Sequence, residues 1–195
     1  MKKKLTAVAL IVALLAVAIV GGTLAYFTDT TGTAENVFTV GNVKINLEEP
    51  NWESSGSEDA PEVYPGEALA KDPQVENVGA NPCFVRVSVS DLEIFEGADP
   101  ITLRYQYADG FNTADWTLID GYYYYNKVLA KGETTTPVFD QIVIPTSWTN
   151  GDASSEYSVD VFAQAVQAQG AKPSFADVEN MTPAEIAAWF ATCGL

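Results

Sequence analysis

The chain has 195 residues, with 10 lysines and arginines, 26 aspartates and glutamates, and no histidine. The missing histidine excludes Ser-His-Asp triads, Cys-His nucleophile pairs and the histidine-based zinc helix of many proteases. A formal charge of −16 argues against nucleic acid as a partner, because such binding depends mainly on lysine and arginine neutralising phosphates.

The first 25 residues are predicted to be a secretory signal peptide that forms an N-terminal helix. Three lysines at positions 2–4 precede an apolar run, Leu5–Val20, and small residues follow it. This order is typical of signal peptides, and the run is short for a membrane span, which needs about 20 residues. We expect cleavage between Ala25 and Tyr26, so that only the uncleaved precursor contacts the membrane; an uncleaved anchor is the alternative.

The mature chain is predicted to be all-β. Apolar and polar residues alternate with period two in the runs 43–48, 83–89, 102–107 and 157–165, as in half-buried strands. Short strands separated by proline and glycine favour a sandwich or barrel. We therefore divide the chain into a signal peptide (1–25), an antiparallel β-sandwich (26–170) and a C-terminal helical extension (171–195).

A tyrosine-rich hairpin is predicted in the second half of the chain. Tyr122–Tyr125 with Val128-Leu129 forms one strand, Ala130–Glu133 the turn, and Val138–Ile144 the return strand. Four consecutive tyrosines place two rings on each face of a strand. Cross-strand packing is the favoured interpretation of these rings, and a carbohydrate-binding platform is the alternative. The acidic, serine-rich stretch Glu53–Glu62 is predicted to be a mobile surface loop.

The C-terminus carries the signature of a short helix. Thr182 can cap it, Pro183 occupies its first position, and Glu185 completes a capping box. Ile186, Trp189 and Phe190 then share one face. The sequence leaves open whether this helix docks on the sandwich or projects from it.

Cys83 and Cys193 are the two cysteines of the chain. In an exported protein they could form a disulfide, which would close a loop of about 110 residues. The alternative is that Cys83, on the apolar side of a predicted strand, is a small core residue.

No catalytic, cofactor-binding or metal-binding residue is predicted. Carboxylates are scattered, and no pair stands out as the two acids of a glycosidase. Two acidic clusters could attract calcium, but neither has the spacing of a calcium-binding loop, so solvated turns are the better interpretation. The clusters are Asp109, Asn112 and Asp115, and Asn150, Asp152 and Glu156.

The segment Gly21–Val43 resembles the signal-peptide junction of the TasA/camelysin family, exported Gram-positive proteins processed by a SipW-type signal peptidase. The matching positions are Ala25, Tyr26, Phe27, Asp29, Asn36, Phe38 and Gly41. A second block looks like the same family and comprises Pro65-Gly66-Glu67, Lys71, Asn77, Gly79 and the Val85–Val89 strand.

The resemblance implies a jelly-roll sandwich that is secreted to the cell surface or the extracellular matrix. TasA-like members form biofilm matrix fibres in which the N-terminal segment of one subunit completes the sheet of the next. The donor here would be Tyr26–Val40, including Phe27, Asn36, Val37, Phe38 and Val40. The implied partners are the SipW-type signal peptidase and further copies of the chain, with no cofactor and no nucleic acid.

Camelysin-like members have also been classed as metalloproteases. Zinc proteases ordinarily hold their metal with imidazole nitrogen, which this chain lacks. We therefore predict a structural protein rather than an enzyme. The alternative function is a monomeric surface module that binds glycans or proteins, with the tyrosine-rich run as its binding platform.

Overall fold

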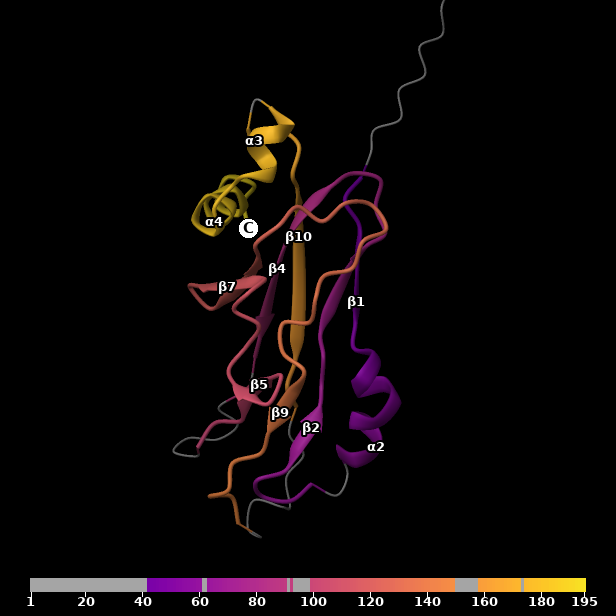
Figure 1. The fold of residues 1–195 in the computed structure, drawn as a ribbon, viewed down its shortest axis with the longest axis vertical. Helices are drawn as coiled ribbons and strands as arrows, with labels where there is room; N and C mark the ends of the chain where they lie inside the picture. The colour runs from indigo at the N-terminus through magenta and orange to yellow at the C-terminus, as the bar shows by residue number, and fades with distance from the viewer. Residues whose placement is uncertain (1–41, 61–62, 91, 93–98, 150–157, 173) are drawn as a thin grey trace, which may run out of the picture. The chain divides into compact units, whose positions relative to one another are not determined.

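The computed structural model describes residues 42–60, 63–90, 92, 99–149, 158–172 and 174–195 (Figure 1). One compact unit spans Val40–Leu195. Several predicted features lie outside the described residues: the signal peptide, the Ala25–Tyr26 cleavage site, and the donor residues Phe27, Asn36, Val37, Phe38 and Val40.

The described chain is built mainly from short strands. They are β1 (Ile45–Glu48), β2 (Ala68–Ala70), β3 (Gln74–Asn77), β4 (Cys83–Val89), β5 (Thr102–Tyr105), β6 (Ala108–Asp109), β7 (Trp116–Ile119), β8 (Tyr122–Tyr125), β9 (Gln141–Val143) and β10 (Val161–Gln167). Every ladder between them is antiparallel. Two four-stranded sheets have the orders β10-β4-β8-β7 and β2-β9-β5-β6, and β1 pairs with β3.

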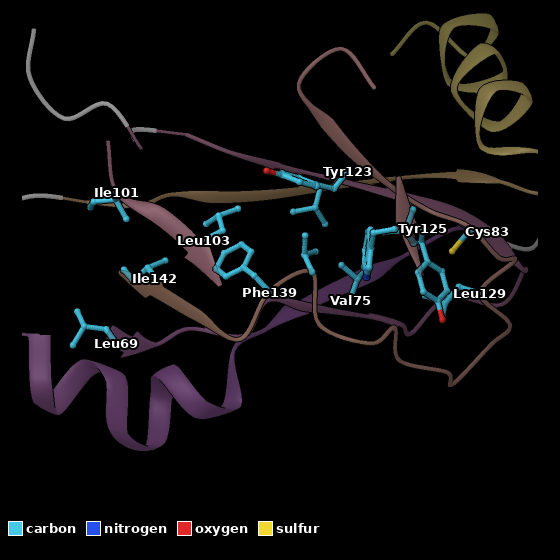
Figure 2. Close-up of a cluster of buried hydrophobic side chains, with 14 of the residues drawn as sticks. Leu69, Val75, Cys83, Ile101, Leu103, Tyr123, Tyr125, Leu129, Phe139 and Ile142 are labelled. Carbon is cyan, nitrogen blue, oxygen red and sulfur yellow. The ribbon is translucent and has the colours of Figure 1, made fainter. Parts of the chain in front are cut away.

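The main core lies between the strands of these sheets (Figure 2). Cys83, Val85 and Val87 of β4 point into it and are fully buried, as the period of two predicts. Leu69, Leu103 and Ile142 enter the same core from β2, β5 and β9. The predicted all-β sandwich is therefore confirmed, because side chains from one face of each sheet share a single interior.

The predicted hairpin between the tyrosines and Val138–Ile144 is wrong. β8 pairs with β7 on one side and with β4 on the other, whereas β9 belongs to the other sheet, between β2 and β5. The true hairpin turns at Asp120-Gly121, where both residues have positive φ, 49° and 81°. This two-residue turn is a strong hairpin signal, and it holds β7 against β8.

The interpretation of Glu53–Glu62 as a loop is also wrong over its described part. A π-helical turn, η1 (Trp52–Gly56), continues into α2 (Ser57–Asp59). The Ser55 hydroxyl donates to the Asn51 carbonyl at 3.0 Å, and the Lys71 ammonium lies 4.8 Å from the centre of a Trp52 ring. Tertiary contacts with the residues after β2 thus make this polar stretch helical.

The predicted C-terminal helix is confirmed as α4 (Pro183–Thr192), with Thr182 and Glu185 forming the capping box. A shorter helix, α3 (Phe175–Glu179), precedes it. A second apolar cluster joins α4 to the outer face of the β10-β4-β8-β7 sheet, through Phe84 and Tyr124 on the sheet and Ile186 and Phe190 on the helix. The helix therefore docks on the sandwich.

Candidate functional site

The candidate site is the border between β1 and β10, which are both labelled in Figure 1 and have Cα atoms within 8 Å of each other. β10 pairs with β4, and β1 pairs with β3. Among the strands that the structure describes, no backbone ladder joins β1 to β10. We call this the β1–β10 border and define it by Val43, Ile45 and Leu47 on one side and Val161, Ala163 and Ala165 on the other.

The ladder register shows which way the backbone of β10 points. The Ser90 N–H donates to the Asp160 carbonyl at 2.9 Å, and the Ala168 N–H donates to the Pro82 carbonyl at 3.0 Å. Antiparallel strands alternate between residues that bond to one neighbour and residues that face the other side. Val161, Ala163 and Ala165 therefore direct their N–H and C=O groups away from β4.

The same reasoning applies to β1. The Ala80 N–H donates to the Asn42 carbonyl at 3.0 Å, and the register continues through Asn46↔Glu76 and Glu48↔Gln74. Even-numbered residues of this segment thus face β3. Val43, Ile45 and Leu47 direct their backbone groups toward the β1–β10 border.

The apolar side chains of the border lie at the rim of the main core, where burial is only partial. All six border residues are partly buried and pack against the main core, whereas Val85 and Val87 of the adjacent β4 are fully buried. Backbone groups that no other described strand pairs with therefore coincide with partly buried apolar side chains. An extended segment placed along this edge would satisfy the first and cover the second.

The spacing of the two strands decides how a segment could enter. A strand bonded to both β1 and β10 needs about 9.5 Å between them, twice the interstrand spacing. Some Cα atoms of β1 and β10 lie within 8 Å of each other. A guest strand that pairs with β10 along this edge would lie about 5 Å from it, so β1 must move aside to admit it.

The tyrosine run offers no exposed carbohydrate platform. Tyr123 and Tyr125 enter the main core, and Tyr124 lies in the second apolar cluster against Phe190. Their exposed fractions are 8%, 7% and 4%, so packing is what the structure assigns to these rings. Tyr122 is partly buried beneath the guanidinium of Arg86.

The two cysteines are free in the structure, so the candidate disulfide is not formed. Cys83 is buried in the main core, while Cys193 lies exposed at the end of α4. The reason is the strand alternation: Phe84 faces the helix, so Cys83 points to the opposite side of the sheet. Burial raises the pKa of the Cys83 thiol to about 12.

The acidic cluster around Asp115 is occupied by protein groups. Asp115 accepts from the Lys127 ammonium at 2.6 Å and from the Thr136 hydroxyl at 2.9 Å. Hydrogen bonding by Lys127 lowers the pKa of Asp115. Because its carboxylate already pairs with Lys127, we do not expect Asp115 to bind calcium. The second cluster, Asn150, Asp152 and Glu156, lies outside the described residues.

Strand alternation was visible in the sequence, but the edge was not. The sequence predicts Val161, Ala163 and Ala165 on one face of a strand, and no local signal says whether that strand has one neighbour or two. The Asp120-Gly121 pair, in contrast, is a local hairpin signal, and it predicts that β7 and β8 form the hairpin.

Comparison with known protein families gives a match to the N-terminal part of the chain. The family model described as camelysin metallo-endopeptidase matches residues 1–86, which include β1, β2, β3 and the beginning of β4. No curated protein matches the chain.

The residues present do not fit the metal that this family description implies. The sequence has no histidine, and the described residues contain no group of three or more cysteines, aspartates or glutamates placed to hold an ion. No helix in the described part of the chain is long and apolar enough to cross a membrane.

The family match indicates an extracellular or cell-surface protein. It also covers both blocks whose residues resemble the family, the predicted signal-peptide junction and most of the stretch from Pro65 to Val89. The match over residues 1–86 therefore confirms the resemblance to the TasA/camelysin family that the sequence predicts.

Proposed function

We propose that the mature chain is a secreted structural protein of an extracellular or biofilm matrix, and that it forms fibres by strand donation. Segment 26–40 of one copy pairs with the outward-facing edge of β10 in the next copy. The observation that carries the proposal is the coincidence, at Val161, Ala163 and Ala165, of outward-facing backbone groups and partly buried apolar side chains.

The donor segment has the composition that this edge needs. Val37, Phe38 and Val40 supply apolar side chains, which would cover the half-buried residues of the border. The segment directly precedes the compact unit, so every copy carries both a donor and an acceptor edge. A head-to-tail contact of this kind produces a filament when its rotation does not close a ring.

The charge of the chain sets the conditions for assembly. Copies of the mature chain, which lack the three lysines at positions 2–4, keep 7 basic and 26 acidic residues. Their formal charge of −19 makes them repel one another at low ionic strength. At 0.1 M salt the Debye length is about 10 Å, so repulsion between charges farther apart than this is largely screened. We expect filament growth to become faster as salt is added, whereas the apolar contacts of the donated strand are not weakened by it.

Secretion and processing are part of the same proposal. A SipW-type signal peptidase cleaves after Ala25 and frees Tyr26 as the new N-terminus. N-terminal sequencing of the protein exported by a Gram-positive host should begin at Tyr26. A start at Met1 would mean that the donor segment remains anchored, and would contradict free strand donation.

We do not assign proteolysis to the chain, because neither its composition nor its described carboxylates fit a zinc centre. Chelator-sensitive cleavage of casein by the pure protein would contradict this. The monomeric binding module loses its proposed tyrosine platform, because three of the four rings are buried.

The test of assembly compares three proteins by electron microscopy and light scattering: residues 26–195, residues 42–195, and residues 26–195 carrying Ala163→Pro. Proline is tolerated on an edge strand where its missing N–H would face outward. Ala163→Pro should therefore keep the fold but remove a donor from the acceptor edge.

We expect filaments only from unaltered 26–195, with the other two remaining monomeric. The far-ultraviolet circular dichroism and the melting temperature of Ala163→Pro serve as controls for folding. A peptide comprising residues 26–41 should bind 42–195 with one peptide per chain. Regular filaments formed by 42–195 alone would show that the N-terminal segment is not the donor.

A further inference from the structure

A second surface, on the β2-β9-β5-β6 sheet, has the features of a ligand site. It is an open depression of about 500 Å³ lined by Asn51, Ala70, Gln106, Tyr107, Asp140 and Gln141. This volume falls within the range of small-molecule sites. The lining comes from the segment before η1, from β2, from the β5–β6 turn and from the beginning of β9.

One aromatic side chain, that of Tyr107, lines the depression. Tyr107 is 92% exposed, and it occupies the two-residue turn between β5 and β6. Gln106 and Tyr107 both have positive φ, 51° and 67°, a conformation that glycine, asparagine and aspartate adopt far more readily. Strained residues of this kind cluster at ligand sites.

Asp140 both fixes this turn and leaves an acceptor unused. Its Oδ2 accepts from the Gln106 N–H at 2.8 Å. Its Oδ1 is buried and has no hydrogen-bond partner among the described residues. Carboxylate oxygens in folded proteins are rarely left in that state. A hydroxyl donor entering the depression, with a small rotation of the side chain, would supply the missing hydrogen bond.

The remaining lining decides the chemical class of the ligand. Asn51, Gln106 and Gln141 add amide groups, which donate and accept and so match neighbouring hydroxyls. No lysine or arginine lines the depression, and Asp140 together with the overall negative charge disfavours anions. Ammonium ligands are typically held by cages of several aromatic rings, whereas this site has one.

We propose that this depression binds a neutral carbohydrate, with a sugar ring stacked on Tyr107 and its hydroxyls bonded to Asp140 and the amides. The electropositive C–H face of a sugar ring suits the negative face of an aromatic ring. The site uses a sheet other than that of β10, so it does not depend on strand donation. A matrix subunit with this site would attach neutral polysaccharide along its surface.

The test is isothermal titration calorimetry of residues 26–195 with cellohexaose, maltohexaose and chitohexaose. Alginate oligosaccharides and a lysine-rich peptide are the anionic and cationic comparators. The same titrations on the Ala163→Pro variant separate binding at a single site from avidity on filaments. We expect at least one neutral oligosaccharide to bind, and to bind more tightly than either comparator.

Tyr107→Gly is the informative variant, because glycine accepts the positive φ and the turn should not lose stability. We expect it to weaken binding by roughly tenfold or more, since it removes the stacking surface. Tyr64→Ala is the matched control: Tyr64 is 62% exposed but does not line the depression, and binding should be unchanged.

Three results would overturn the proposal: no binding of any neutral oligosaccharide at millimolar concentration, tighter binding of either comparator that is weakened by Tyr107→Gly, or unchanged oligosaccharide affinity in Tyr107→Gly. None of these results bears on whether residues 26–195 form filaments. A failure of strand donation would equally leave this site intact.

Discussion

The guanidinium of Arg86 lies 3.9 Å from the centre of the Tyr122 ring, on the sheet face that α4 covers. It also lies 4.8 Å from the centre of the Phe190 ring, and it donates to Gln164 Oε1 at 2.8 Å and to Tyr124 Oη at 3.1 Å. Within the described part of the chain, no ion pair neutralises Arg86. Aromatic rings and neutral acceptors therefore hold this buried cation, and they tie the helix to the sheet.

Arg86→Ala should lower the free energy of unfolding by about 2–4 kcal/mol, through lost cation–π contacts and hydrogen bonds. Urea denaturation measures this, and limited proteolysis should release the α4 region first. Arg104→Ala is the control, because the partly buried Arg104 meets the exposed Asp109 only at 3.7 Å; the loss of this long ion pair should cost about 1 kcal/mol or less. Equal effects of the two variants would show that Arg86 does not hold the helix.

Phe190→Ala should be among the most destabilising changes in α4. Phe190 is fully buried and packs edge-to-face on Tyr124 at 5.5 Å, so its removal leaves a cavity costing about 3–5 kcal/mol. The exposed neighbour Ala191 provides the comparison, since Ala191→Ser should cost about 0.5 kcal/mol in urea denaturation. A small effect at Phe190 would mean that α4 contributes little to the fold.

The capping box makes stability depend on acid pH. Hydrogen bonds from Lys172, the larger contribution, and from Thr182 lower the pKa of Glu185 from 4.5 to about 2. The carboxylate is thus easier to ionise in the folded state than in the unfolded state. Its stabilisation is present above pH 4.5 and is lost as the pH falls from there toward 2.

Glu185→Gln should therefore reduce the change in urea midpoint between neutral pH and the acid range. Glu179→Gln, which removes an exposed carboxylate of α3, is the control and should leave that change as in the unaltered protein. Identical pH profiles for Glu185→Gln and the unaltered protein would contradict the role of this carboxylate.

The two thiols should react very differently with Ellman's reagent. Cys193 is exposed, whereas Cys83 is buried with a pKa of about 12 and stays protonated at mildly alkaline pH. The folded protein should show one reactive thiol per chain, and the unfolded protein two. If the unfolded protein shows no reactive thiol in the absence of reductant, Cys83 and Cys193 form a disulfide, which would contradict the free cysteines of the structure.

Gly56→Ala should distort the packing of η1 on β2. A Cβ at this buried position would overlap the Ala70 carbonyl oxygen and come within 2.8 Å of the Trp52 ring. We expect a loss of about 1–3 kcal/mol by thermal or urea denaturation. Ser57→Ala, at the adjacent exposed residue, is the control and should change stability by about 0.5 kcal/mol or less. An equally small effect of Gly56→Ala would contradict the close packing of η1 on β2.

The sequence alone determined those features that depend on neighbouring residues. Period-two alternation predicts the inward side of β4, because successive side chains of a strand point to opposite faces. The spacing from Thr182 to Glu185 predicts the beginning of α4, because capping is completed within one turn. The motifs around Ala25 and Pro65 predict the family that the match over residues 1–86 confirms.

The tertiary structure decided which strand lies beside which. The partner of β8 is β4, whose paired residues Arg86 and Val87 lie more than thirty positions away along the chain, and β9 joins the other sheet. Contacts with Lys71 and Ala70 make a stretch helical that composition predicts to be a loop. Pairing and burial depend on long-range geometry, and therefore local sequence reveals neither the position of β10 at the border of its sheet nor the depression beside Tyr107.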